Sequence, residues 1–173
     1  MKELNIGLFG LGTVGSGIFT VLQRARNCHA RISRICVRSL SKPRAVEVPE
    51  NILTDNPADI LSDPDIDLVV EVIDNAEASF AIVSEAMRRG KSVVSGNKAM
   101  IARHLPELIE LQRQTGTALL YDASACGSIP VIRNLEEYYD NDLLLEVKGI
   151  LNGSSNYILS RVFDHGEDAV VEH

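Results

Sequence analysis

Three glycines near the amino terminus have the spacing of a turn that binds a diphosphate. They follow an apolar run and open a segment with helical periodicity, which is the strand–turn–helix context that the GxGxxG pattern requires. The first glycine permits a tight turn, the second leaves room for a pyrophosphate, and the third lets the helix pack closely on the strand. Free amides at the start of the helix attract the phosphates. A glycine turn without a ligand is the alternative. The candidate cofactor contacts are Gly10, Gly12, Thr13, Val14 and Gly15.

The residues after the second predicted strand bear on which dinucleotide binds. NAD sites usually carry an acid there that accepts from the ribose 2′-hydroxyl, and residues 36–42 contain none. Arg38 and Lys42 can instead hold a 2′-phosphate, with Ser39 or Ser41 donating a hydrogen bond. One or two charge-assisted bonds of about 1.5–3 kcal/mol each favour NADP by roughly tenfold to several hundredfold. We therefore predict NADP, with NAD possible and a solvated basic loop as the alternative.

Strands and helices alternate along most of the chain. The predicted strands are residues 4–9, 31–37, 67–73, 92–94 and 117–121. The predicted helices are residues 13–24, 56–61, 76–89 and 101–115. This order predicts an α/β fold with a Rossmann-type, doubly wound, mostly parallel sheet. We expect this dinucleotide-binding domain to span residues 1–128.

The pattern changes after that point. A helix at residues 129–138, a strand at 143–151 and a helix at 154–163 predict the start of a second, α+β domain at residues 129–173, which would serve substrate binding and dimerisation.

Composition narrows the class of protein. The net charge of −7, from 17 basic and 24 acidic residues, argues against a nucleic-acid or anionic-membrane partner. The three cysteines have no CxxC spacing and are expected to be free thiols in a reducing cytoplasm. No apolar run is long enough to cross a membrane, and the first residues lack the pattern of a signal peptide.

Three further segments, residues 90–99, 122–130 and 151–159, make the interpretation more specific. They carry an Asn-Lys-Ala motif at residues 97–99 and a Leu-Asn-Gly-Ser-Ser-Asn-Tyr motif at 151–157. Together with residues 10–17 they resemble homoserine dehydrogenase in order and spacing, over almost the whole chain. The resemblance implies NAD(P)-linked interconversion of L-homoserine and L-aspartate 4-semialdehyde in the synthesis of threonine, methionine and isoleucine. It also implies a homodimer when the protein is full length.

The Asn-Lys-Ala motif provides the candidate catalytic residue. Lys98 follows a predicted strand, so we expect it at the carboxyl edge of the sheet, where ligands of α/β proteins bind. A cation there can contact the nicotinamide ribose and polarise the reacting oxygen. By resemblance Lys98 contacts both cofactor and substrate. A surface lysine at a helix start is the alternative.

The resemblance also implies a monovalent cation site, for an ion such as Na⁺. Its ligands would be Asp122, where the family usually has Glu, and the carbonyl groups of Ala125, Gly127 and Ile129. Cys126 and Ser128 replace residues that are usually Gly or Ala, and a structural turn without a metal is the alternative.

Two more positions follow from the resemblance. Gly153 and Ser154 would contact the amino-acid end of the substrate, and Ser154 is also a candidate helix cap. Asp74 and Asn75 stand where the family usually has two glycines beside the nicotinamide. Asn75 is therefore a candidate cofactor contact, and Asp74 adds negative charge and bulk near the ring.

The acids and the second lysine that hold the substrate in this family lie beyond the last matching segment. We therefore interpret the chain as a C-terminally truncated piece or a divergent fragment, and expect it to bind a dinucleotide with little or no dehydrogenase activity. Two alternatives are a non-catalytic dinucleotide-binding sensor or interaction module, and another Rossmann amino-acid dehydrogenase such as aspartate dehydrogenase.

Overall fold

The computed structural model describes residues 3–25, 28–126, 129–141, 143–150 and 152–165. The chain divides into two compact units, Met1–Ser124 and Ala125–His173. Within the described residues, no helix has the length and apolar character needed to cross a membrane.

The first unit is built on one parallel sheet. Its strands are β1 (Leu4–Phe9), β2 (Ala30–Cys36), β3 (Leu53–Thr54), β4 (Leu68–Glu71), β5 (Ser92–Ser95) and β6 (Leu119–Leu120). They lie in the order β3-β2-β1-β4-β5-β6, and every pairing is parallel. This is the doubly wound order, in which the chain changes direction between β1 and β4 and leaves a crevice at their carboxyl ends.

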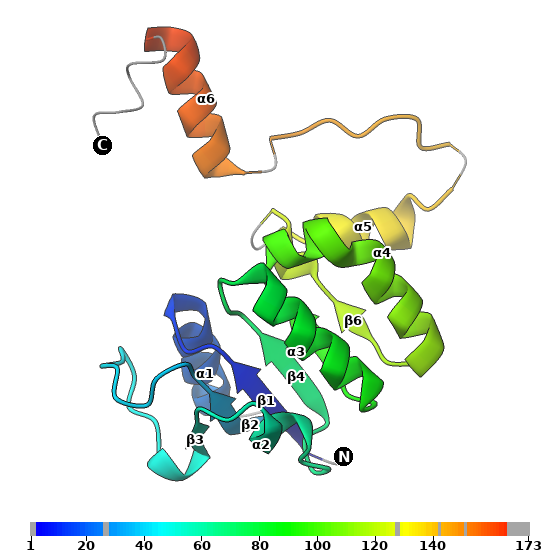
Figure 1. Ribbon diagram of the computed structural model, residues 1–173. Coiled ribbons are helices and arrows are strands. Elements are labelled where there is room, and N and C mark those ends of the chain that lie inside the picture. The colour runs from blue at the N-terminus through cyan, green and yellow to red at the C-terminus, as the bar shows by residue number, and fades with distance from the viewer. Residues whose placement is uncertain (1–2, 26–27, 127–128, 142, 151, 166–173) are drawn as a thin grey trace. The chain divides into compact units, whose positions relative to one another are not determined.

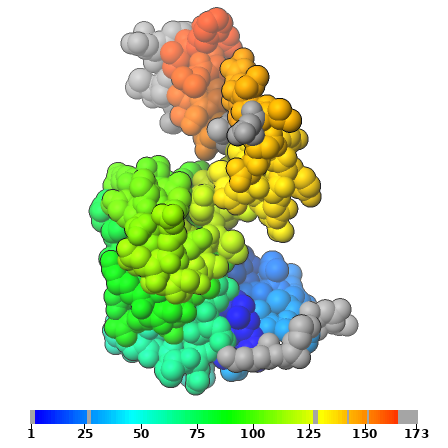
Figure 2. Space-filling model, turned by 90° about the vertical axis from the view of Figure 1, so that its right-hand side faces the viewer, coloured from blue at the N-terminus to red at the C-terminus, as the bar shows by residue number. Residues whose placement is uncertain are grey.

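Helices cover both faces of the sheet (Figure 1). They are α1 (Thr13–Arg24), α2 (Ala58–Leu61), α3 (Ala76–Arg88) and α4 (Lys98–Thr115), with short 3₁₀ turns η1 (Glu50–Ile52) and η2 (Asp122–Ser124). Phe19 of α1 packs with Leu8 and Ile35 on one face. On the other face, Val69 and Val93 pack with α2, α3 and α4. The side chains of β4 alternate between these two cores, because neighbouring residues of a strand point to opposite sides. The green residues of α3 and α4 form one continuous surface in Figure 2.

The predicted elements of this unit are confirmed with small shifts at their ends. The strand at residues 4–9 and the helix at 13–24 have the predicted bounds. The helix predicted from residue 101 begins earlier, at Lys98, and the strand predicted at residues 117–121 is confined to β6. Strand β3 was not predicted, because it is two residues long and is defined by its pairing with β2.

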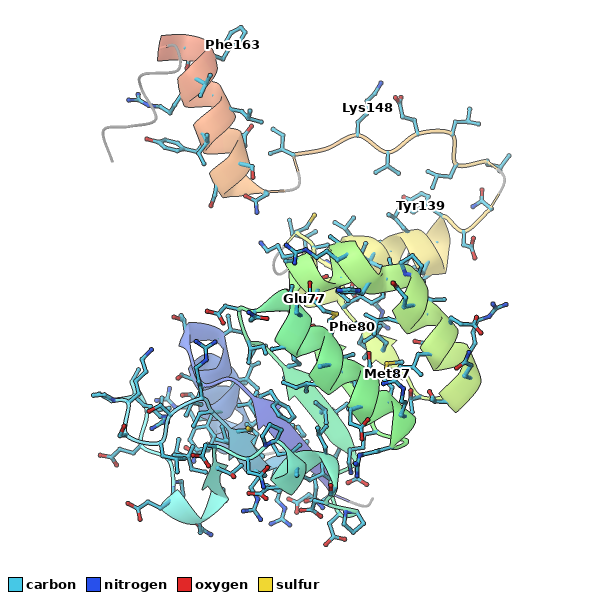
Figure 3. All side chains as sticks on the ribbon, in the orientation of Figure 1. Glu77, Phe80, Met87, Tyr139, Lys148 and Phe163 are labelled. Carbon is cyan, nitrogen blue, oxygen red and sulfur yellow. The ribbon has the colours of Figure 1, made fainter. Side chains whose placement is uncertain are left out.

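The second unit contains α5 (Val131–Tyr138) and α6 (Gly153–His165). The strand predicted at residues 143–151 was wrong for its described part, because residues 143–150 adopt no strand and Leu151 lies outside the described residues. A strand requires a partner for its backbone groups, and this apolar stretch is exposed, with Leu145 93% accessible. Phe163 likewise projects from α6 with 91% of its surface accessible (Figure 3).

Candidate functional site

The turn between β1 and α1 is tight at two glycines and open at a third. Gly10 has a φ of +97°, and a Cβ built on it would lie 3.0 Å from the carbonyl oxygen of Val72. A Cβ on Gly15 would lie 2.1 Å from the carbonyl oxygen of Gly10. A Cβ on Gly12 would meet no described heavy atom within 4 Å. The open side of Gly12 is therefore where a pyrophosphate could approach the backbone.

The amino terminus of α1 differs from those of α3 and α4. Asn75 caps α3 by accepting from the amide of Ala78, and Asn97 caps α4 by accepting from the amide of Met100. Helix α1 begins after Gly12, and no side chain among the described residues caps it. Its first turn also holds no acidic residue. The first amides of α1 are consequently available to an anion.

A cavity of about 330 Å³ lies at the carboxyl ends of β4 and β5. Its walls include Val14 and Ile18 of α1, Val72 and Ile73 after β4, and Gly96 after β5. An apolar cavity bordered by an anion-binding helix terminus suits a ligand that joins a flat ring to a diphosphate.

The basic loop after β2 is held by a residue that the sequence analysis did not identify. Arg44 donates to the carbonyl groups of Ser39 at 2.6 Å, Leu40 at 2.9 Å and Lys42 at 3.0 Å. These three bonds fold the loop around the guanidinium of Arg44 and leave Arg38 and Lys42 exposed on its surface. No sequence pattern predicts that Arg44 holds this loop, because its acceptors are backbone carbonyl groups, which every residue has.

Arg38 reaches across to the loop after β4. Its Nη2 lies 3.5 Å from Oδ1 of Asp74, and both side chains are mostly exposed. The acid that we expected beside the nicotinamide therefore also faces the predicted 2′-phosphate ligand, while lining the cavity.

Lys98 is the first residue of α4 and is exposed. A lysine at this end of a helix is disfavoured by the helix dipole, so helix stability does not explain it. The preceding Asn97 is buried and fixed, because its Nδ2 donates to the carbonyl oxygen of Ile73 at 3.1 Å. The backbone that carries Lys98 is thereby tied to the loop that lines the cavity.

Glu71, the last residue of β4, is a second residue of the site that the sequence motifs do not identify. Its side chain is fully buried, and its carboxylate accepts from the amide of Ile73 and from the hydroxyls of Ser79 and Ser95. The sequence signal was one acid inside the otherwise apolar stretch at residues 67–73.

The predicted cation ligands fall in both units. Asp122 is half-buried in η2 of the first unit, whereas Ala125 and Ile129 belong to the second. Gly127 lies outside the described residues.

The predicted substrate contacts Gly153 and Ser154 are exposed at the start of α6. Capping by Ser154 was wrong, because Asn152 takes that role by accepting from the amide of Ser155 at 2.9 Å. The helix begins one residue earlier than predicted, which puts the side chain of Ser154 inside its first turn.

Comparisons with known proteins point to one family. The family model described as "Homoserine dehydrogenase, NAD binding domain" matches residues 10–122, and the model "Homoserine dehydrogenase" matches residues 130–173. The homoserine dehydrogenase of Bacillus subtilis (strain 168) is 36% identical over 94% of this chain and 39% of its own length. That of Synechocystis sp. is 39% identical over 95% of this chain and 39% of its own length.

Solved structures agree with the sequence matches. The crystal structure of a homoserine dehydrogenase from Thiobacillus denitrificans is 36% identical, with a TM-score of 0.83 over 99% of this chain and 42% of the other. The S. aureus homoserine dehydrogenase at pH 8.5 is 34% identical, with a TM-score of 0.73 over 99% of this chain and 44% of the other. The chain thus spans about 39% of the length of the curated relatives it matches.

Proposed function

The chain belongs to the homoserine dehydrogenase family, and from that premise we propose that it forms the dinucleotide-binding part of an enzyme that interconverts L-homoserine and L-aspartate 4-semialdehyde. The observation that carries the proposal is the uncapped start of α1 beside the open face of Gly12. The family's NAD-binding domain model covers this region. The two alternatives, a non-catalytic module and another amino-acid dehydrogenase, gain no support from the comparisons.

The proposed contacts run from the amino terminus of α1 to the cavity at the carboxyl ends of β4 and β5. The amides of Thr13, Val14 and Gly15 bind the pyrophosphate, and the cavity beside Ile73 and Gly96 receives the nicotinamide. The nicotinamide, when bound, accepts or supplies the hydride. Asn75 is proposed as a further cofactor contact through its backbone or the free edge of its amide, because its Oδ1 already caps α3.

Lys98 is proposed as the catalytic residue. Its ammonium group is exposed and enters no ion pair among the described residues, so it is available to the reacting oxygen of the substrate. There it would stabilise the developing alkoxide and hold the proton that is exchanged with the hydroxyl group.

NADP is the proposed cofactor. Arg38 and Lys42 present two cations on a loop that Arg44 holds folded, so less conformational entropy is lost when they bind a 2′-phosphate. A carboxylate at this position would repel that phosphate, and residues 36–42 contain no acid.

A domain boundary between residues 128 and 129 is proposed from the change of pattern along the sequence. The proposals that rest on the family are substrate contacts at Gly153 and Ser154, and a Na⁺-like cation at Asp122 and the carbonyl groups of Ala125, Gly127 and Ile129. We also propose that the full-length protein is a homodimer. Free Cys28, Cys36 and Cys126 support a reducing, cytoplasmic location.

Calorimetric titration with NADPH and NADH tests the cofactor. We expect NADPH to bind at least about tenfold more tightly, corresponding to about 1.4 kcal/mol. Arg38→Ala should remove most of that difference and leave the affinity for NADH within about twofold. Arg113→Ala, which removes an exposed arginine at the far end of α4, is the control. Equal affinities in the unsubstituted chain would exclude the NADP preference, and no binding of either dinucleotide would exclude the proposed function.

A further inference from the structure

Glu71 is a buried acid whose carboxylate has hydrogen-bond donors but no cationic partner among the described residues. The side chain is 0% exposed at the end of β4, where the neighbouring positions of the strand are valines. Burying a charge is costly, and an apolar residue of similar volume would avoid that cost. The hydrogen bonds of a buried polar group can hold together the chain segments that they join, and an apolar side chain cannot do this.

The hydrogen bonds of Glu71 join the two loops that line the cavity. Its Oε1 accepts from the amide of Ile73 at 2.7 Å, in the loop after β4. Its Oε2 accepts from the hydroxyl of Ser95 at 2.7 Å, at the end of β5. The Ser95 hydroxyl in turn accepts from the amide of Asn97 at 3.1 Å. The carboxylate therefore connects the loop after β4 with the residue that precedes Lys98.

Asn97 closes this chain of bonds into a ring. Its Nδ2 donates to the carbonyl oxygen of Ile73 at 3.1 Å, so Ile73 is held at its amide by Glu71 and at its carbonyl by Asn97. The backbone reinforces the link, because the amide of Gly96 donates to the carbonyl oxygen of Glu71 at 3.0 Å. Ile73 and Gly96 are both cavity walls.

Ser79 makes a different connection. Its hydroxyl also donates to Oε2 of Glu71, but Ser79 lies within α3, one turn after the Asn75 cap. This bond ties the end of β4 to its own following helix and does not reach the loop that carries Lys98. Ser79 and Ser95 are both fully buried, so they form a matched pair of single-hydroxyl deletions.

We infer that Glu71 is a positioning residue that acts through Ser95 and Asn97. It sets the loop after β4 and the first turn of α4 at the separation that the nicotinamide end of the cofactor requires, and so places Lys98. The inference rests on the proposed function and adds to it a residue that touches neither cofactor nor substrate. It assigns no role to Glu71 at the adenosine end, because Arg38 and Lys42 lie on the loop after β2, and the contact of Arg38 with the loop after β4 is an exposed, solvent-screened ion pair with Asp74.

The test compares a whole cofactor with its adenosine half. The variants Glu71→Gln, Ser95→Ala and Ser79→Ala of this chain are titrated with NADPH and with 2′,5′-ADP, which lacks the nicotinamide. The fluorescence of bound NADPH reports the surroundings of the nicotinamide, and thermal unfolding reports stability. Glutamine keeps the shape of the side chain, but one of its two terminal positions is an NH2 donor, so it cannot accept from the Ile73 amide and from both serine hydroxyls at once.

The expected pattern separates positioning from stability. Glu71→Gln and Ser95→Ala should weaken NADPH binding by about fivefold or more and shift the emission of bound NADPH toward that of free NADPH, with 2′,5′-ADP affinity changed by less than about twofold. Ser79→Ala should lower the unfolding temperature to a similar degree as Ser95→Ala and leave both affinities and the emission unchanged.

Three results would overturn the inference. The first is parallel loss of NADPH and 2′,5′-ADP binding, which would mean that Glu71 only stabilises the domain. The second is unaltered NADPH affinity and emission in folded Ser95→Ala, which decides the matter even if Glu71→Gln does not fold. The third is that the unsubstituted chain binds NADPH without any change in the fluorescence of NADPH, which would mean that the nicotinamide does not enter the cavity. Failure of the unsubstituted chain to bind any dinucleotide is distinct, because it removes the proposed function and this inference with it.

Discussion

The guanidinium of Arg38 lies 3.5 Å from the carboxylate of Asp74, a residue that lines the proposed cofactor cavity. The cation that we assign to the 2′-phosphate of NADP therefore already has an anionic neighbour in the free protein. Because both side chains are more than four-fifths exposed, solvent screens their attraction, and the pair contributes only about 0.2–1 kcal/mol. We therefore expect Asp74 to lower the proposed affinity for NADP without abolishing it.

Asp74→Asn should strengthen NADPH binding, because Arg38 no longer has a competing carboxylate and the phosphate meets one negative charge fewer. We expect an increase of roughly 1.5- to 5-fold at low ionic strength, which shrinks as salt is added. The measurement is the dissociation constant of NADPH over a series of salt concentrations. Asp65→Asn removes the same charge from the opposite edge of the sheet and is the control. Weaker NADPH binding by Asp74→Asn would show that the acid itself contacts the cofactor.

Gly12→Ala should separate folding from dinucleotide binding. The added methyl group meets no described atom of the protein, so the loss of stability should stay below about 1 kcal/mol. It occupies the space where the pyrophosphate approaches, so NADPH affinity should fall by at least about tenfold. Unfolding curves and titration check the two effects. Unchanged affinity in a folded Gly12→Ala variant would place the pyrophosphate elsewhere.

Two neighbouring glycines serve as comparisons. Gly15→Ala puts a Cβ 2.1 Å from the carbonyl oxygen of Gly10, and such overpacking should cost about 1–3 kcal/mol or more of stability. Gly17→Ala lies on an open face of α1 and should stabilise the helix by about 0.5–1 kcal/mol with unchanged binding. The order of stability is therefore predicted as Gly17→Ala, Gly12→Ala, Gly15→Ala.

Cys36 should resist alkylation while Cys28 reacts. Burial, followed by the charges of Asp55 and Asp59, raises the pKa of Cys36 from 9.0 to about 11. At about pH 8.5 the thiolate fraction of Cys36 is then well below one percent, and the thiolate is the nucleophile. Cys28 is exposed. Mass spectrometry after iodoacetamide treatment should find Cys28 modified and Cys36 free, with Cys36 labelled once guanidinium unfolds the chain. Rapid labelling of Cys36 in the native protein would contradict its burial.

The lowered pKa of Lys91 predicts that its contribution to folding stability changes with pH in the opposite direction to that of Cys36. Burial lowers the pKa of Lys91 from 10.5, although Asp63 and Asp67 oppose the shift. Just below pH 10.5 the unfolded chain therefore binds more protons at this site than the folded chain does, so the contribution of Lys91 to stability rises with pH through that window. For Cys36, the folded chain keeps its proton between about 9.0 and 11, so its contribution falls with pH.

Lys91→Met removes the titrating ammonium group and so isolates its pH-dependent contribution to stability. The ammonium group donates to the carbonyl oxygens of Asp63 at 2.5 Å and Ile66 at 2.8 Å, and its loss leaves these acceptors without that donor at a cost of about 1–3 kcal/mol. Denaturant unfolding should show that the advantage of the unsubstituted chain over Lys91→Met grows as the pH rises toward 10.5. Lys148→Met, at an exposed lysine of the second unit, should show no such trend (Figure 3). A difference that stays constant with pH would mean that folding does not lower the pKa of Lys91.

The sequence by itself determined the parts of this protein that depend on near neighbours. The periodicity of residues 13–24 predicted α1 to its first and last residue, and the glycine spacing predicted a turn with one open and two tight positions. The alternation of elements predicted the parallel sheet. The helix and the turn follow from interactions within a few residues along the chain, so the local pattern carries them. The parallel sheet follows from the right-handed connections that alternating strands and helices make.

Tertiary structure decided which side chains meet. Glu71 and Ser95 are 24 residues apart, and Arg38 and Asp74 are 36 apart, yet each pair is joined because parallel strands bring their carboxyl ends to one edge of the sheet. The same reason explains the incorrect strand at residues 143–150, where the pattern of apolar residues suited a strand but no partner strand pairs with it among the described residues. Pairing and burial depend on what lies alongside in space, and no window of sequence contains that information.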